Sequence, residues 1–199
     1  MMWDNGGDVY TSRSSRAMKG AMDKESDLSS LVSILERAYS GELAAAYAYR
    51  GHWKSLKDPA EIARIKQIED EEWLHRGNIA RMMQYMKVEP GRLREARCWI
   101  VGRIIGIGCH LIGWFLPMYF AGRLESGNTI EYENAAVYAG QLGLADFESE
   151  LLVMSRVEKE HELFFLGVIS NHPWLPLVSR IFKWGAQAEV RCQRSDASL

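Results

Sequence analysis

Hydrophobic residues recur with the spacing of α-helices over most of the chain. One apolar stripe runs from residue 28 to about 57, and the same period returns over 59–87, over 130–141 and from the turn at 143–146 to about 170. No stretch shows the alternation or the β-branched enrichment typical of strands. The sequence therefore predicts an all-α protein whose four main helices form two hairpins.

Local signals mark where these helices begin and end. Asp58-Pro59-Ala60-Glu61 combines an N-cap, a proline at the first helical position and a capping-box glutamate, and Glu89-Pro90-Gly91 is a clear helix breaker. Ser126-Gly127-Asn128-Thr129 predicts the start of the third helix at about residue 130. Residues 1–26 lack any period and predict a flexible tail, which leaves a single domain over 27–199 closed by a short helix at 177–190.

A Glu-x-x-His pair occurs twice, in the middle of an apolar stripe each time. The pairs are Glu72 with His75 and Glu158 with His161, and each puts a carboxylate and an imidazole on one helix face. Taken alone, the first pair would also fit an exposed acidic run, because residues 69–72 are all acidic. The matched second copy favours burial, where an unpaired charge costs several kcal/mol, so both pairs need a partner. A metal ion is the natural one.

The first helix of each predicted hairpin also carries a glutamate followed seven positions later by a tyrosine. We identify these as Glu42 with Tyr49 and Glu131 with Tyr138, and the same spacing favours Glu131 over Glu133. One glutamate and one Glu-x-x-His pair from each hairpin is a combination that binds two metal ions between four helices. The two tyrosines either fill the core or donate hydrogen bonds to the ligand carboxylates.

The predicted ligand set suits iron. Four carboxylates and two neutral imidazoles provide hard oxygen and borderline nitrogen donors, and four negative charges balance two divalent ions. Glu72 and Glu158 are placed to bridge two iron ions, which could then reduce dioxygen together. Manganese has similar ligand preferences and remains an alternative. The predicted metal ligands are Glu42, Glu72, His75, Glu131, Glu158 and His161.

These six residues and their spacings resemble the ferritin-like di-iron carboxylate superfamily over about residues 30–168. With a very apolar crossover between the hairpins, the chain is most similar to the demethoxyubiquinone hydroxylase family of ubiquinone biosynthesis. The resemblance implies a ferritin-like four-helix bundle and a dioxygen-dependent monooxygenase that hydroxylates the ring of an apolar, quinone-like substrate with electrons from an external donor. The alternatives are a rubrerythrin-like peroxidase, another di-iron oxidase or hydroxylase, and a non-enzymatic ferritin-like iron-binding protein.

Composition narrows the setting of this chemistry. The 199 residues carry a formal net charge of −2, which argues against a general nucleic-acid-binding protein. The three cysteines form no Cys-x-x-Cys pair, so neither a rubredoxin-like module nor a disulfide framework is indicated. No secretory h-region follows the N-terminus, and we expect a cytoplasmic protein.

The most apolar stretch, residues 98–122, is long enough to be a transmembrane helix. A single span there would put the two halves of the metal site on opposite sides of a bilayer. We therefore expect either a crossover packed on the bundle or a segment that dips into one leaflet. Arg92, Arg94 and Arg97 would suit anionic headgroups on the inner face of the cell membrane, and an exposed apolar run would also suit a homodimer or a helper protein.

Overall fold

The computed structural model describes the backbone of residues 7–185 and the side chains of residues 20–185. Within this part the chain forms six helices and no strand, as predicted. The helices are α1 (Gly7–Ser55), α2 (Pro59–Tyr85), α3 (Arg92–Gly108), α4 (Phe115–Gln141), α5 (Ala145–Ile169) and α6 (Leu175–Phe182).

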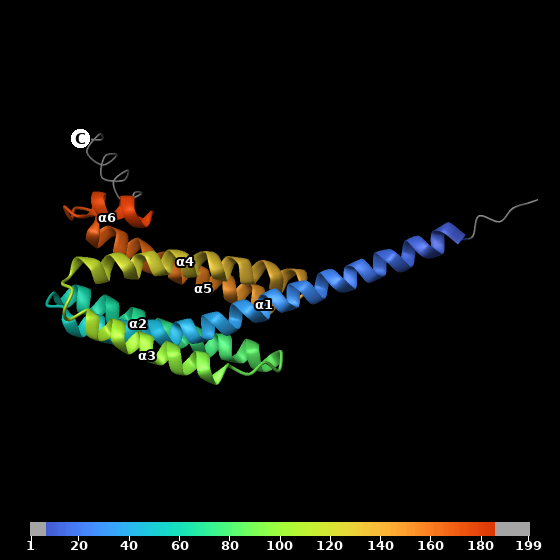
Figure 1. Ribbon diagram of the computed structural model, residues 1–199, viewed down its shortest axis with the longest axis horizontal. Helices are drawn as coiled ribbons and strands as arrows, with labels where there is room; N and C mark the ends of the chain where they lie inside the picture. Colours follow the sequence, from blue (N-terminus) through green and yellow to red (C-terminus); the bar gives the residue numbers. More distant parts are fainter. Residues whose placement is uncertain (1–6, 186–199) are drawn as a thin grey trace, which may run out of the picture.

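Two antiparallel hairpins form the body of the molecule. α1 pairs with α2, α4 pairs with α5, and the two pairs pack through α1 and α4 (Figure 1). α3 lies along α1, and α6 lies at the end of the α4–α5 pair (Figure 1). The predicted helical bundle of two hairpins is confirmed.

The start of α2 follows the capping chemistry in the sequence. Asp58 accepts hydrogen bonds through Oδ1 from the backbone N–H groups of Ala60 and Glu61, at 2.8 and 3.0 Å. Pro59 occupies the first turn, where a missing N–H costs nothing because that group has no helical partner. The helix ends at Tyr85, within two residues of the predicted end.

The third main helix begins earlier than predicted. α4 starts at Phe115, so the predicted cap at residues 126–129 lies in the helix interior. Thr129 donates its hydroxyl hydrogen bond back to the carbonyl of Glu125 at 2.9 Å, as threonines inside helices do. Pro117 causes no break because it lies in the first turn. Local capping propensity was thus outweighed by the packing of a longer helix.

Both ends of the chain also differ from the prediction. α1 begins at Gly7, so residues 7–26, predicted as a flexible tail, have helical backbone; residues 1–6 lie outside the described part. α6 covers Leu175–Phe182 and not 177–190. It ends where Lys183 adopts a left-handed conformation with φ of 58°, and residues 186–190 lie outside the described part.

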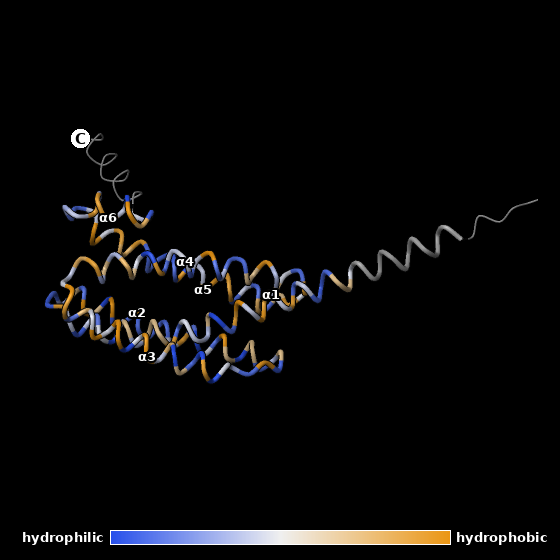
Figure 2. The backbone as a smooth tube through the Cα atoms, viewed as in Figure 1, coloured by the Kyte–Doolittle hydropathy of each residue, from blue (hydrophilic) through white to orange (hydrophobic). Residues whose placement is uncertain are grey.

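The apolar stretch 98–122 is divided between two helices. It contains the end of α3, the connection at 109–114 and the start of α4. The orange segments of α3 in Figure 2 mark hydrophobic residues. α3 approaches α1 backbone to backbone, since a Cβ atom added to Gly51 would lie 2.3 Å from the Cα atom of Gly106. The opposite face of α3 is exposed. No helix in the described part of the chain has the length and apolar character needed to cross a membrane.

Two apolar clusters fill the bundle on either side of its midpoint. The first joins the C-terminal half of α1 to α6 and includes Tyr119 and Phe165. The second lies toward the α4–α5 turn and includes Leu31 and Leu35, together with the methionines Met82, Met83 and Met86. The polar residues between these clusters form the candidate site.

Candidate metal centre

Six buried residues from four helices meet at the midpoint of the bundle. α1 contributes Glu42, α2 contributes Glu72 and His75, α4 contributes Glu125, and α5 contributes Glu158 and His161. Their exposed fractions lie between 0% and 3%. They form two groups whose ligand atoms lie within 4.8 Å of one another, and Glu72 and Glu158 belong to both groups. The groups are Glu42, Glu72, His75 and Glu158, and Glu72, Glu125, Glu158 and His161.

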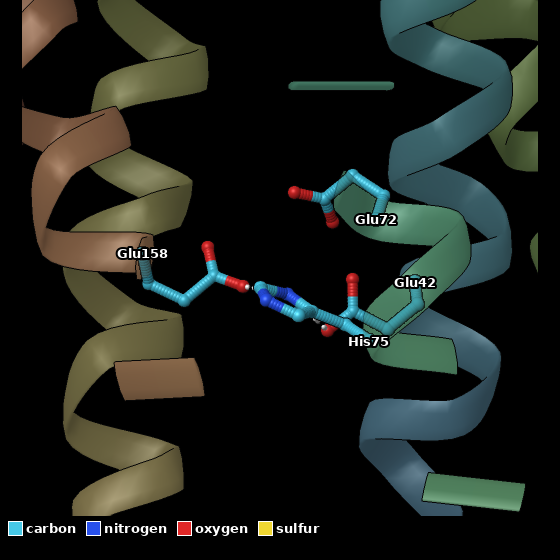
Figure 3. Close-up of side chains that lie close together, drawn as sticks. All are labelled: Glu42, Glu72, His75 and Glu158. Atoms are coloured by element: carbon cyan, nitrogen blue, oxygen red, sulfur yellow. Dashed lines mark ion pairs between the residues drawn. The ribbon is translucent and has the colours of Figure 1, made fainter. Parts of the chain in front are cut away.

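The first group brings the two hairpins together. Figure 3 shows Glu158 reaching from one hairpin toward Glu42, Glu72 and His75 on the other. The Nδ1 atom of His75 lies 2.8 Å from a carboxylate oxygen of Glu158 and 4.0 Å from one of Glu42. These distances leave the imidazole facing carboxylates from both hairpins.

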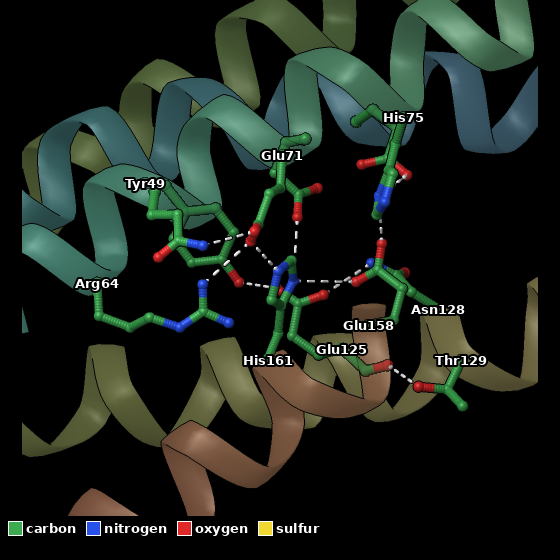
Figure 4. A network of polar contacts seen from close by, with 12 residues as sticks. Tyr49, Arg64, Glu71, His75, Glu125, Asn128, Thr129, Glu158 and His161 are labelled. Carbon is green, nitrogen blue, oxygen red and sulfur yellow. Dashed lines mark hydrogen bonds and ion pairs between the residues drawn. The ribbon is translucent and has the colours of Figure 1, made fainter. Parts of the chain in front are cut away.

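The second group is arranged in the same way. The Nδ1 atom of His161 lies 3.5 Å from Glu72 Oε1 and 3.5 Å from Glu158 Oε2. Its other nitrogen, Nε2, lies 2.7 Å from Glu71 Oε2, and Arg64 holds that carboxylate from outside at 3.1 Å (Figure 4). A proton on Nε2 satisfies Glu71 and turns the lone pair of Nδ1 toward the centre, which is the usual arrangement of a metal-binding histidine.

The centre holds polar atoms that the described protein residues leave unsatisfied. Seven buried oxygen and nitrogen atoms of five of these residues make no hydrogen bond of good geometry with the described residues, although some lie close to one another, as His75 Nδ1 does to Glu158. Each such atom costs about 1–3 kcal/mol if it stays unpaired. They are Glu42 Oε2, both carboxylate oxygens of Glu72 and of Glu158, and the Nδ1 atoms of His75 and His161. The donor set is therefore one that cations would complete.

Electrostatics points the same way. Burial raises the pKa of Glu72 and of Glu125 well above its usual range, and the nearby carboxylates raise each pKa further. Burial also raises the pKa of Glu158 to about 8 and lowers the pKa of His161. Without cations, the protein would have to protonate these carboxylates or hold them against mutual repulsion. Divalent ions would remove that cost.

Two tyrosines link the hairpins at the centre. Tyr49 on α1 donates a hydrogen bond to Glu125 on α4, and Tyr132 on α4 donates one to Glu42 on α1. Each hairpin thus orients the glutamate of the other. On each helix the glutamate lies seven positions before the tyrosine of the same helix.

Glu125 replaces the predicted Glu131 in this arrangement. Glu131 has a side chain that is 31% exposed and forms an ion pair with Arg37 at 2.9 Å, and Glu133 is exposed. Six residues correspond to about 240° around a helix, so Glu125 and Glu131 cannot face the same centre. The prediction of Glu131 was wrong because it placed the start of the helix too late.

The tyrosine of the third main helix changes with the glutamate. Tyr138 is half-buried against the apolar cluster around Leu31. Tyr132 occupies the position beside a glutamate of the centre that was expected for Tyr138. Tyr49 does lie at the centre, as predicted. The signal for the missed pair was present, because Glu125 and Tyr132 also have the Glu-x6-Tyr spacing.

The other histidines of the described residues lie outside both groups. His52 is buried in the apolar cluster with its ring stacked on Phe165, and burial lowers its pKa to about 4. His172 stacks on Phe115 with ring centroids 4.1 Å apart. Neither ring is available to the centre.

No protein-family model, curated protein or solved structure matches this chain. The geometry of the buried Glu/His clusters, which could hold metal ions, therefore carries the functional argument.

Proposed function

We propose that the chain is a ferritin-like di-iron oxidoreductase that uses dioxygen to hydroxylate a quinol-type aromatic ring, as demethoxyubiquinone hydroxylases do. The observation that carries the proposal is the pair of buried ligand groups with Glu72 and Glu158 in common. Shared carboxylates would place two ions close together, and four carboxylates would balance the charge of two divalent ions. Manganese would satisfy the same donors.

Each residue of the centre has a part in this proposal. Glu42 and His75 would hold one ion, Glu125 and His161 would hold the other, and Glu72 and Glu158, which belong to both groups, would contribute to both sites. Tyr49 and Tyr132 fix the orientation of the two terminal glutamates through their hydrogen bonds. The apolar clusters on either side keep bulk water away from the centre. Iron bound there would supply the redox chemistry that activates dioxygen.

The reaction needs an outside source of electrons. One oxygen atom of dioxygen replaces a hydrogen on the ring as a hydroxyl group, and the other leaves as water. The balance takes two electrons and two protons, which an external donor must provide because the sequence has no flavin, nicotinamide or rubredoxin-like motif.

An apolar substrate dissolves in a membrane, so the protein must reach one. The exposed outer face of α3 favours binding to a membrane surface. Ile104 and Ile107 on this face are 62% and 63% exposed, and Leu111, in the connection that follows α3, is 80% exposed. The basic residues Arg92 and Arg97 lie on the same helix and suit anionic headgroups. We propose that α3 rests on the inner face of the cell membrane.

Vesicle binding tests this location. The protein should sediment with vesicles of anionic phospholipid, and Ile104→Glu with Ile107→Glu should abolish the sedimentation while leaving the helical content unchanged. A stable homodimer through the same face, or capture of the face by a helper protein with no vesicle binding, would overturn the membrane proposal.

Isotope labelling tests the reaction. Iron-loaded protein is reduced chemically and mixed with ¹⁸O₂ and a short-chain quinol that lacks one ring oxygen. The proposal predicts one ¹⁸O atom in the ring by mass spectrometry, with none when Glu158→Ala is used. Rapid oxidation of the iron without any labelled product would contradict hydroxylation.

A second function has one observation in its favour. A narrow pocket beside Glu42, described below, fits a molecule of the size of dioxygen or hydrogen peroxide. A rubrerythrin-like peroxidase would need no larger route. Reduced protein that reacts rapidly with peroxide and slowly with dioxygen would favour that function. Bound iron that reacts with neither would favour a non-enzymatic iron-binding protein.

A further inference from the structure

A small pocket opens between α1 and α4 and ends at the candidate metal centre. Its volume is about 60 Å³, and Glu42 and Tyr132 lie at its inner end. The walls are formed by Gly41, Ala45 and Leu124. Glu42 is 3% exposed, and its Oε2 atom has no hydrogen-bond partner among the described residues. A residue of the candidate centre that has an unsatisfied carboxylate oxygen thus lines the pocket.

A wider groove adjoins this pocket on the outside. It has a volume of about 450 Å³, is lined by α4 residues, and shares Leu124, Asn128 and Glu131 with the inner pocket. Arg37 reaches from α1 to Glu131, with Nη2 at 2.9 Å and Nε at 3.2 Å from Oε1. This ion pair joins the two helices where the groove meets the pocket.

The size of the pocket selects what can pass. A water molecule occupies about 30 Å³ of liquid, whereas benzene fits an engineered cavity of about 150 Å³. A diatomic molecule fits a volume of about 60 Å³, and an aromatic ring does not.

We propose that this pocket is the inlet through which dioxygen reaches the centre, on the side of Glu42 and His75. The inference rests on the proposed function, because a centre that does not react with dioxygen needs no such inlet. It separates the path of the oxidant from that of any ring-sized substrate. In this proposal Glu131, which is paired with Arg37, lies at the mouth of the inlet and outside the metal centre.

Gly41 offers a direct way to close the inlet. It lines the pocket, and a Cβ atom added there would meet nothing within 4 Å. The series Gly41→Ala, Gly41→Val and Gly41→Leu should therefore fill the pocket step by step without forcing α1 and α4 apart. Gly20→Leu is the matched control, since Gly20 lies on the same helix and also has open space around it.

The rates of dioxygen oxidation and of nitric oxide binding to the ferrous protein are measured by stopped-flow spectroscopy. Both rates should fall along the series, by about tenfold for Gly41→Leu, which corresponds to an added barrier of about 1.4 kcal/mol. Iron content should stay the same, and Gly20→Leu should match the unmodified protein. Unchanged rates in Gly41→Leu with full iron content would overturn the inlet while leaving the proposed function standing.

A third readout does not depend on the metal. Crystals of metal-free protein under xenon pressure should show xenon beside Gly41 and Ala45, and Gly41→Leu should remove it. Xenon that stays in place in Gly41→Leu would contradict the assignment of the pocket. A wild-type ferrous protein that binds nitric oxide and does not react with dioxygen would instead overturn the proposed function.

Discussion

The two hairpins supply the same ligands but surround them differently. In the α4–α5 half, Glu125 accepts hydrogen bonds from Tyr49 and from Asn128 Nδ2, the latter at 3.1 Å, and His161 is held by Glu71. In the α1–α2 half, Glu42 has Tyr132 as its partner and lines a pocket. Matched candidate ligands therefore have unmatched surroundings: hydrogen bonds surround Glu125 and His161 in one half, and the other half leaves room beside Glu42.

The largest effect should come from a residue that both halves need. Glu158→Ala removes a ligand from both groups, so we expect the loss of both metal ions. Mass spectrometry after iron loading measures the number of metal ions bound per chain. Glu160→Ala on the same helix is the control, because Glu160 is exposed and should leave the stoichiometry unchanged. Full iron content in Glu158→Ala would refute the bridging role.

A variant of one terminal glutamate should separate the halves. Glu125→Ala should lose the ion beside His161, whereas Glu131→Ala should keep both ions, because Glu131 faces Arg37 at the surface. Metal titration with a divalent ion by calorimetry would give one site in the first variant and two in the second. The opposite result would restore Glu131 as the ligand.

The stability of the metal-free protein should fall as the pH rises. The folded-state pKa of Glu158 is raised from 4.5 to about 8, so folding favours its protonated form and stability is lost as the pH passes through that range. The lowered pKa of His161 acts in the opposite direction below its ordinary value of 6.5. Denaturant unfolding between pH 6.5 and 8 avoids the contribution of His161 and measures the combined effect of Glu158, Glu72 and Glu125, whose raised pKa values act in the same direction.

The matched variants for this effect are Glu158→Gln, which should reduce the pH dependence while Glu72 and Glu125 maintain the rest, and Glu160→Gln, which should leave it unchanged. Metal-loaded protein should show no such loss over the same range. A metal-free protein that becomes more stable toward pH 8 would contradict the picture of buried, uncompensated carboxylates.

The smallest effect should come from the support of one histidine. Glu71→Gln weakens the hydrogen bond that orients His161, and changes of this kind lower metal affinity by about 10–100-fold. Only the affinity of the site at Glu125 and His161 should fall, and the affinity of the site at Glu42 and His75 should stay unchanged. Competition with a chelator measures both affinities, and Glu133→Gln serves as the surface control. An equal loss at both sites would show that the halves are not independent.

Five of the six residues of the centre could be predicted from the sequence because their signal is local. A Glu-x-x-His pair fixes its own geometry within one helix, so two copies in the same apolar register identify Glu72, His75, Glu158 and His161 directly. Glu42 followed from the apolar stripe of α1, in which it lies.

The sixth residue depended on where a helix begins, which local signals did not decide. Glu125 and Glu131 are both followed by a tyrosine at the seventh position, and a glycine two residues beyond Tyr138 matched the one beyond Tyr49. Residues 126–129 also have the composition of a cap. Only the packing of α4 from Phe115 onward brings Glu125 to the centre. The buried positions of α4 before the false cap, such as Met118 and Gly122, continue through Glu125 to Tyr132.

In the fold, too, the features set by local signals could be predicted, and those set by contacts between distant residues could not. The boundaries of α2 followed from Asp58, Pro59 and the breaker at Pro90, which act through the backbone nearby. The division of residues 98–122 between α3 and α4 did not, because the contact of Gly106 with Gly51 joins residues far apart in the chain. Tertiary contacts of this kind leave only a weak trace in a single sequence.

The most direct test of the account is an anomalous diffraction map of crystals loaded anaerobically with ferrous iron. The account predicts two iron peaks inside the bundle, one beside Glu42 and His75 and one beside Glu125 and His161, with Glu72 and Glu158 between them. Folded crystals without an iron peak at these residues, or with iron bound at Glu131, would contradict it.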